Sequence, residues 1–261
     1  EVILTATLTL GTETVTRDFP VSIKAEEPAN TYASIAAMHD AAIINEVIEF
    51  QGIVTGIFDG GYFLTDGTNA LGIYNPGTTL TELAVGDEVK VVGSYAVYNT
   101  LYQLGSVVVE ELISTGNVNP LAGTEMVVTV AELLAVDSSN ALIHGMYYTV
   151  TGTVELRGDS DNVYLVDGED AVLIYYYSLA TSIAHLEAQV GKEVTITVFY
   201  YTNHGSNGPM VAFDGNAEDV VVSTLPDDEA LAADIAALET DVPGITLESI
   251  VLPTEGPNGT M

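Results

Sequence analysis

Carboxylates gather in one stretch of the chain, between residues 158 and 170. Two of them lie in the loop sequence GDSDN, and three more, Asp167, Glu169 and Asp170, follow within eight residues. Calcium takes oxygen ligands from carboxylates and from loop carbonyls, so this stretch is the candidate calcium site. The candidate ligands are Asp159, Asp161, Asp167 and Glu169. The alternative is a plain turn, because Asp, Asn, Ser and Gly are also the usual turn formers.

Tyrosines are the other residues with a chemical use. Tyr62, Tyr74, Tyr98 and Tyr102 could stack on the flat face of a ligand. Nucleic acid requires a cationic groove beside such aromatic residues, and the formal net charge of -32 opposes it. We therefore exclude nucleic acid and keep a carbohydrate or another neutral ligand as the candidate. The alternative is that these tyrosines pack within the fold.

Catalytic groups are not arranged in any familiar pattern. The four histidines are not spaced as metal ligands, and neither a G-x-S-x-G elbow nor a phosphate-binding loop occurs. The absence of cysteine removes thiolate chemistry, disulfides and cysteine-based zinc sites. The sequence therefore predicts a protein that is not an enzyme and has no cofactor other than the candidate calcium.

Composition indicates the kind of environment that the protein occupies. The chain has 37 acidic residues against 5 basic ones, although only 16% of residues are charged. Such a surface keeps molecules apart and attracts cations. A solvated acidic exterior is the simplest reading, and a salt-rich or calcium-rich habitat is the alternative. No run of about 18 apolar residues occurs, so we expect no membrane insertion in this segment, and any export signal to lie outside it.

An internal repeat sets the domain organisation. Residues 50–104 are loosely repeated at 150–213: the first copy contains YFLTDG and VGDEVKVVGSY, and the second contains VYLVDG and VGKEVTITVFY. Offsets of 100 to 105 residues are too long for a solenoid, so each copy should be a small domain. Residues 30–113 and 118–222 are the two predicted domains, each with about five short strands and a short helix before the first. A further helix is expected near 178–189, and residues 114–124 read as a linker.

Five strands, a helix before the first and an insert between the third and fourth resemble the plan of the OB-fold, a small partly open barrel. In particular, the sequence is similar to OB-like modules of secreted bacterial multidomain proteins, in which such modules often stand beside nuclease or phosphatase domains. The resemblance covers about two thirds of the chain and implies an all-β fold with two OB-like five-stranded barrels.

The two ends resemble a different family, the bacterial Ig-like domain of surface proteins in Mollicutes and related bacteria. Residues 1–26, with VILTATLTLGTETVTRDFPVSIK, resemble its closing strands, and residues 224–261, with LPTEGPNGT, resemble its opening segment. The resemblance implies incomplete Ig-like β-sandwich segments at both ends. Either the chain is an excerpt of a longer array, or the tail of one copy completes the head of the next. The residues expected to assemble are Val2, Leu4, Leu8, Leu10, Leu247, Ile250 and Leu252.

These observations predict a structural or adhesive protein outside the cell or on its surface. It would be a repeat or subunit of a stalk or filament that assembles head to tail with copies of itself or with neighbouring Ig-like modules. The alternative is a carbohydrate-binding accessory module of a larger secreted enzyme.

Overall fold

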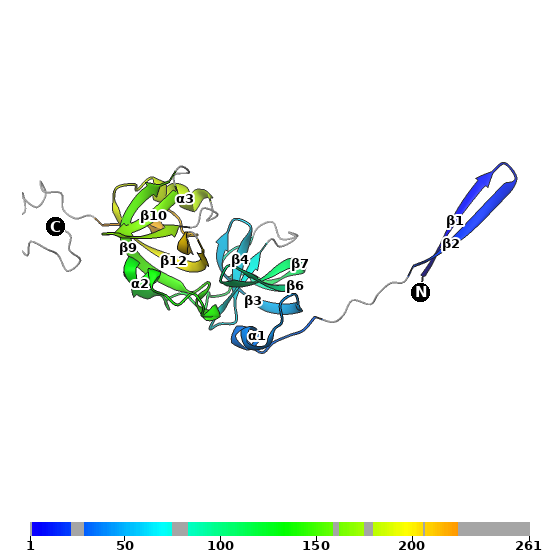
Figure 1. Cartoon of the computed structure of the whole chain (residues 1–261), viewed down its shortest axis with the longest axis horizontal. Coiled ribbons are helices and arrows are strands. Elements are labelled where there is room, and N and C mark those ends of the chain that lie inside the picture. Colours follow the sequence, from blue (N-terminus) through cyan, green and yellow to red (C-terminus); the bar gives the residue numbers. More distant parts are fainter. Residues whose placement is uncertain are drawn as a thin grey trace, which may run out of the picture.

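The computed structural model describes residues 2–21, 29–74, 83–158, 162–174, 180–205 and 207–223. It shows an all-β protein with two five-stranded barrels packed side by side and a separate two-stranded hairpin at one end of the molecule (Figure 1). The all-β prediction with two barrels is therefore confirmed. Among the described residues, no helix is both long and apolar enough to cross a bilayer.

The first barrel is built from five strands: β3 (Val47–Phe58), β4 (Gly61–Thr65), β5 (Ala70–Tyr74), β6 (Glu88–Tyr98) and β7 (Leu101–Ser114). Their order around the barrel is β3-β4-β5-β7-β6, and it closes because β6 also pairs with β3. One neighbouring pair, β5 and β7, runs parallel. This is the strand order of the OB-fold plan, in which the third and fifth strands meet in parallel.

The second barrel repeats this order with β9 (Tyr147–Arg157), β10 (Asn162–Asp167), β11 (Asp170–Ile174), β12 (Glu193–His204) and β13 (Gly208–Ala212). It closes through β12 and β9, and its parallel pair is β11 with β13. Two short strands, β8 (Met126–Val128) and β14 (Val221–Val222), extend the sheet beyond the barrel. The helix α3 (Ala180–Glu187) lies between the third and fourth barrel strands, as predicted.

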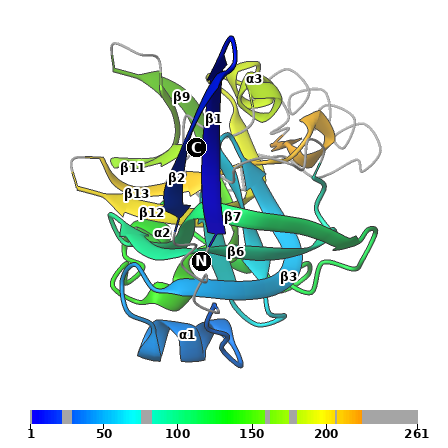
Figure 2. The same ribbon diagram turned by 90° about the vertical axis from the view of Figure 1, so that its right-hand side faces the viewer.

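A short helix precedes each barrel and closes one end of it. α1 (Ile35–Ala41) buries Ile35 and Met38 in the core of the first barrel, and α2 (Val130–Leu134) buries Val130 and Leu133 in the second. The hydroxyl of the residue before each helix accepts a hydrogen bond from the third backbone N–H, which satisfies one of the free donors there. Figure 2 shows α1 below β3, at the end of its barrel. The repeat seen in the sequence is thus a repeat of helix and barrel together.

The N-terminal hairpin consists of β1 (Val2–Leu10) and β2 (Glu13–Val21), joined by a turn at Gly11, whose φ of 60° suits glycine. Every described side chain in it, from residue 5 to residue 19, is exposed. In Figure 1 the hairpin lies away from both barrels. The predicted Ig-like segment 224–261 lies outside the described residues, as do Leu247, Ile250 and Leu252 within it.

Candidate functional site

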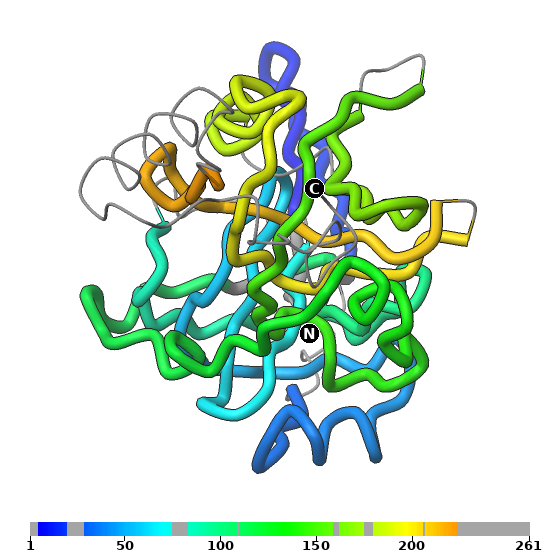
Figure 3. Tube along the Cα trace, turned by 90° about the vertical axis from the view of Figure 1, so that its left-hand side faces the viewer, coloured from blue at the N-terminus to red at the C-terminus, as the bar shows by residue number. Residues whose placement is uncertain are grey.

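The most extensive feature outside the two barrel interiors is the joint between them. Ten buried apolar residues from both barrels and from the connection between them form one cluster. Figure 1 shows the two barrels next to each other, and Figure 3 views them along the long axis of the molecule, so that they overlap. The first barrel supplies Phe58, Phe63, Ala70 and Leu101, the second supplies Leu173, Phe199, Tyr201, Met210 and Ala212, and the connection between them supplies Leu121. The predicted linker is therefore packed into the joint, and the two barrels share a core instead of being strung on a free connection.

Aromatic rings interlock across this joint. Phe63 meets Phe199 edge to face with ring centroids 5.3 Å apart, and Phe58 meets Tyr201 in the same way at 5.1 Å. Such pairs contribute about 0.5–1.5 kcal/mol beyond the area they bury. A side chain at Gly56 would lie 2.8 Å from the Phe199 ring, so glycine at this position lets the two barrels approach.

A polar cluster lies beside the aromatic residues and also crosses the joint. The Thr100 hydroxyl accepts a hydrogen bond from the Asn203 backbone N–H at 2.9 Å and lies 3.2 Å from both the Thr202 hydroxyl and His144 Nε2. Burial lowers the pKa of His144 to about 4, so its ring is neutral near pH 7. With Nδ1–H bonded to the Ala141 carbonyl, Nε2 is free to accept from Thr100. The cluster fixes the rotation of one barrel against the other.

On another side of the joint, a half-buried carboxyl group lies where the barrels meet. Asp214 Oδ2 accepts a hydrogen bond from the Ile57 backbone N–H at 3.1 Å. The pKa of Asp214 is raised to about 6, mainly by burial and to a smaller extent by the nearby Asp219, although the bond from Ile57 acts in the opposite direction. Asp214 lines a pocket of about 350 Å³ with Tyr147, Phe213, Asn119 and Asn216, among others. Carboxylate, amide and aromatic groups thus converge in one hollow.

The four predicted ligand-binding tyrosines do not form one surface. Tyr62 is 2% exposed and lies in the core of the first barrel, so it has no face to offer a ligand. Tyr102 packs against Tyr95 and His39 with ring centroids 5.8 Å and 5.1 Å away. Tyr74 and Tyr98 are about two-fifths exposed, but the strand register separates them by four residues, or about 13 Å. The structure therefore leaves two separate exposed tyrosines in place of a stacking platform.

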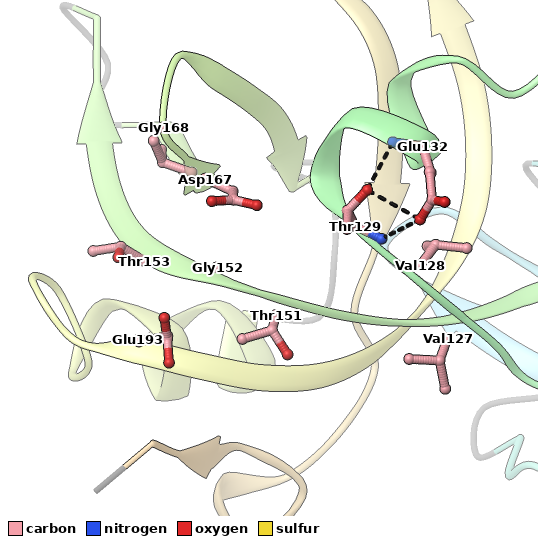
Figure 4. A pocket seen from close by; sticks show the side chains of 11 residues that line it. Val127, Val128, Thr129, Glu132, Thr151, Gly152, Thr153, Asp167, Gly168 and Glu193 are labelled. Carbon is pink, nitrogen blue, oxygen red and sulfur yellow. Dashed lines mark hydrogen bonds between the residues drawn. The ribbon is translucent and has the colours of Figure 1, made fainter. Parts of the chain in front are cut away.

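The predicted calcium loop is only partly described. Asp159 and Asp161 lie outside the described residues. Asp167 lines a pocket of about 280 Å³ on the second barrel with Glu193, Glu132, Thr151 and other residues (Figure 4), and Glu169 is exposed in the adjoining turn. One oxygen of Glu132, Oε2, already accepts bonds from the Thr129 N–H and hydroxyl at 2.9 and 3.0 Å. Within the described ranges, no group of three or more acidic or histidine side chains is placed to hold a metal, so calcium stays a prediction.

Basic residues do not combine into a surface for a polyanion. Lys90 forms an ion pair with Glu111 at 2.8 Å, and Arg157 forms one with Glu155 at 2.9 Å. Lys192 donates to Gln189 on the far side of the second barrel. Each of these three side chains thus forms an ion pair or a hydrogen bond with a neighbouring residue.

The hairpin has two chemically different faces. In the register of β1 and β2, Leu8 is opposite Val15, and Ala6 is opposite Arg17, which lies 5.3 Å above the Phe19 ring. The other face pairs threonines with each other and with Asp18, which accepts a bond from the Thr5 hydroxyl at 2.7 Å. Leu8 is 74% exposed and Leu10 is 83% exposed. The predicted assembly residues Val2 and Leu4 lie in β1, but their side chains are outside the described part.

Comparisons with known proteins place the chain only distantly. No protein-family model matches it, and no curated protein matches it either. Among solved structures, one described as "Structural mimicry for functional antagonism" is similar with a TM-score of 0.34 and 8% sequence identity. The likeness covers 63% of this chain and 87% of that chain. At this distance it carries no functional meaning.

Sequence reasoning missed the joint, although the sequence contains a signal for it. A strand with one buried face alternates apolar and polar residues, whereas one buried on both faces reads as an unbroken apolar run. All five residues of β4 are buried, and so are the five consecutive residues 198–202 of β12. The apolar runs GYFL and VFYY therefore predict strands that are buried on both faces.

Proposed function

We propose that this chain is a non-enzymatic structural protein of the cell exterior, a repeat or subunit of a surface stalk or filament. In this proposal the fused barrels are its stiff body, and its ends make the head-to-tail contacts. The observation that carries the proposal is the joint, because a shared aromatic core gives the two barrels one fixed arrangement. The exposed hairpin, which has no covering layer, supports the second part.

The joint also uses the surface that an OB-fold ordinarily keeps for ligands. That surface is the outer face of the second and third strands, which here are β4 and β5 in the first barrel. Phe63 and Ala70 lie on this outer face and are fully covered by the second barrel. In the second barrel, Leu173 of its third strand is covered in turn, and Tyr164 packs against the same cluster. Such an arrangement favours a mechanical role over recognition of nucleic acid or another extended ligand.

Resemblance adds the setting to this proposal. The OB-like plan and the Ig-like ends fit a secreted or surface multidomain protein of Mollicutes or related bacteria. Calcium, bound by the loop that contains Asp159 and Asp161, would stiffen the second barrel in that setting.

Electron microscopy and analytical ultracentrifugation test the structural role. We expect the purified chain to form linear, concentration-dependent oligomers in which each unit contains two touching lobes at a constant angle. Deleting residues 1–21 should abolish the oligomers and leave the two-lobed unit intact. Monomers at all concentrations up to the millimolar range, or lobes at variable angles, would contradict the proposal.

A carbohydrate-binding role is the second candidate, and the pocket at the joint favours it. Asn119, Asn216 and Asp214 offer polar groups there, while the half-buried ring of Tyr147 offers apolar surface, a combination that suits a neutral sugar. A glycan array with the wild-type chain and with Asn216→Ala tests this role. Binding that the substitution removes would support it, and an array with no signal would exclude it.

A further inference from the structure

The apolar face of the hairpin contains one cation without a carboxylate partner in the described structure. The ion pairs among the described residues are those of Lys90 and Arg157, whereas Arg17 lies over the Phe19 ring. Arg17 is also the only basic residue of the hairpin. On this face it is surrounded by Ala6, Leu8, Val15 and Phe19. A partner that adds apolar surface and one anion would complement this face.

The hairpin also lacks a third strand. A two-stranded sheet is marginally stable in water, and three strands with an apolar face are the smallest independently stable unit. Both backbone edges of the hairpin are unpaired within the described structure, because β1 and β2 pair with each other in a sheet of two strands. Strand addition along an edge satisfies the free N–H and C=O groups there and extends the same two faces.

Residues 224–261 contain a segment with the required chemistry. The run ITLESIVL, residues 245–252, is as long as β2 to within one residue, and Glu248 is its only charged residue. In a strand, where side chains alternate, Glu248, Ile250 and Leu252 would share one face. Residues 224–261 include no lysine or arginine but have eight acidic residues, so this part of the chain is repelled by most of a surface with a net charge of -32. The hairpin, with Arg17 against Glu13 and Asp18, is nearly neutral.

We infer that residues 245–252 of a second copy of this chain add to the free edge of β2, with Glu248 opposite Arg17 on the apolar face. Ile250 then lies beside Val15 in an antiparallel pairing or beside Phe19 in a parallel one, and either contact extends the apolar face. The partner is a second copy because the second barrel, from which residues 224–261 continue, lies at the opposite end of the molecule from the hairpin (Figure 1). This inference rests on the proposed head-to-tail assembly and names its contact.

Disulfide trapping tests the contact directly, because the chain has no cysteine of its own. Full-length chains carrying Arg17→Cys are mixed with full-length chains carrying Glu248→Cys under mild oxidation. We expect mixed disulfide dimers in large excess over dimers of either chain with itself. Thr16→Cys is the matched control, since its neighbouring position faces the threonine side of the hairpin. Equal trapping by Thr16→Cys, or a majority of Arg17→Cys dimers with themselves, would overturn the inference.

Charge exchange provides a second test without oxidation. Arg17→Glu should weaken the self-association of the full chain about fivefold or more at low ionic strength, because opposed like charges replace an attractive pair. A chain with both Arg17→Glu and Glu248→Arg should recover the wild-type affinity. Association that neither substitution changes would overturn this contact while leaving head-to-tail assembly in place. A wild-type chain that stays monomeric would remove both.

Discussion

Replacing Asp214 by asparagine should stabilise the protein at neutral pH, although it removes a charge from a hydrogen-bonded position. The Asp214 carboxylate lies at the joint, and its pKa is raised by burial to about 6 from an ordinary value of 3.8. Folding therefore favours the protonated form. Asparagine has the same shape, keeps an oxygen that accepts the bond from Ile57, and carries no charge to desolvate.

The magnitude follows from the two pKa values. A difference between about 6 in the folded chain and 3.8 in the unfolded chain corresponds to about 3 kcal/mol, at about 1.4 kcal/mol per pH unit. Asp214 is partly reached by solvent in its pocket, which reduces the expected effect to about 1–2 kcal/mol. The folded chain binds this proton more tightly than the unfolded chain does. The loss of stability caused by the ionised Asp214 is therefore complete above pH 6, and it disappears as the pH falls from 6 toward 3.8.

Chemical denaturation at pH 7.5 and pH 4.5 measures the effect. The asparagine variant should exceed the wild type in free energy of unfolding at pH 7.5, and the difference should shrink at pH 4.5. The comparison between two chains at each pH cancels the repulsion of the other carboxylates, including Asp219 and Glu125 in the same pocket. Glu218→Gln is the control. This substitution removes the same charge four residues away, at a side chain that is exposed. A variant that is less stable at pH 7.5, or a difference independent of pH, would refute the reasoning.

Three further substitutions test the joint and the hairpin. Phe199→Ala leaves a cavity in the joint, so we expect the free energy of unfolding to fall by about 3–5 kcal/mol and the barrels to unfold in two calorimetric transitions in place of one. A single transition at an unchanged temperature would contradict a shared core. Gly145→Ala should loosen the joint, because the added Cβ would lie 2.6 Å from the Ala70 side chain. Gly123→Ala is the control in the same thermal melts, since Gly123 has a similar positive φ but no atom within 4 Å of the added Cβ. Leu8→Ser should leave the barrel melting temperature unchanged and reduce self-association in sedimentation, because Leu8 is exposed on the apolar face of the hairpin.

Much of the fold could be predicted because its signals are local. The Asp-Gly turns at 66–67 and 167–168, the capped helices and the alternation of the hairpin each depend on a few neighbouring residues. Because the sequence is duplicated, the same order of strands is predicted independently from both copies. What sequence could not give is the arrangement of the two barrels, which depends on contacts between residues more than 100 positions apart, such as Thr100 with Asn203.

Tyr62 shows why the candidate site was harder to predict than the fold. In β4 the ring of Tyr62 points into the first barrel, and the ring of Phe63 points out into the joint. Alternation reveals the inner face of a strand only when the outer face is polar, and here both faces are apolar. The sequence could not distinguish the two neighbours, so a core residue was assigned to a surface. The prediction for Tyr102 failed for a related reason, because its half-buried ring stacks against Tyr95.

The two barrels contribute chemically different surfaces to the joint. The contact is heterologous, with β4 and β5 of one barrel against β11, β12 and β13 of the other, and such contacts propagate when both units present both surfaces. In the repeat, Phe199 and Tyr201 of the second barrel correspond to Ser94 and Ala96 of the first. The first barrel therefore lacks the aromatic knobs that would fit a further barrel. We therefore expect no further barrel to dock on the first barrel in this way, and the proposed assembly uses the hairpin and residues 224–261 instead.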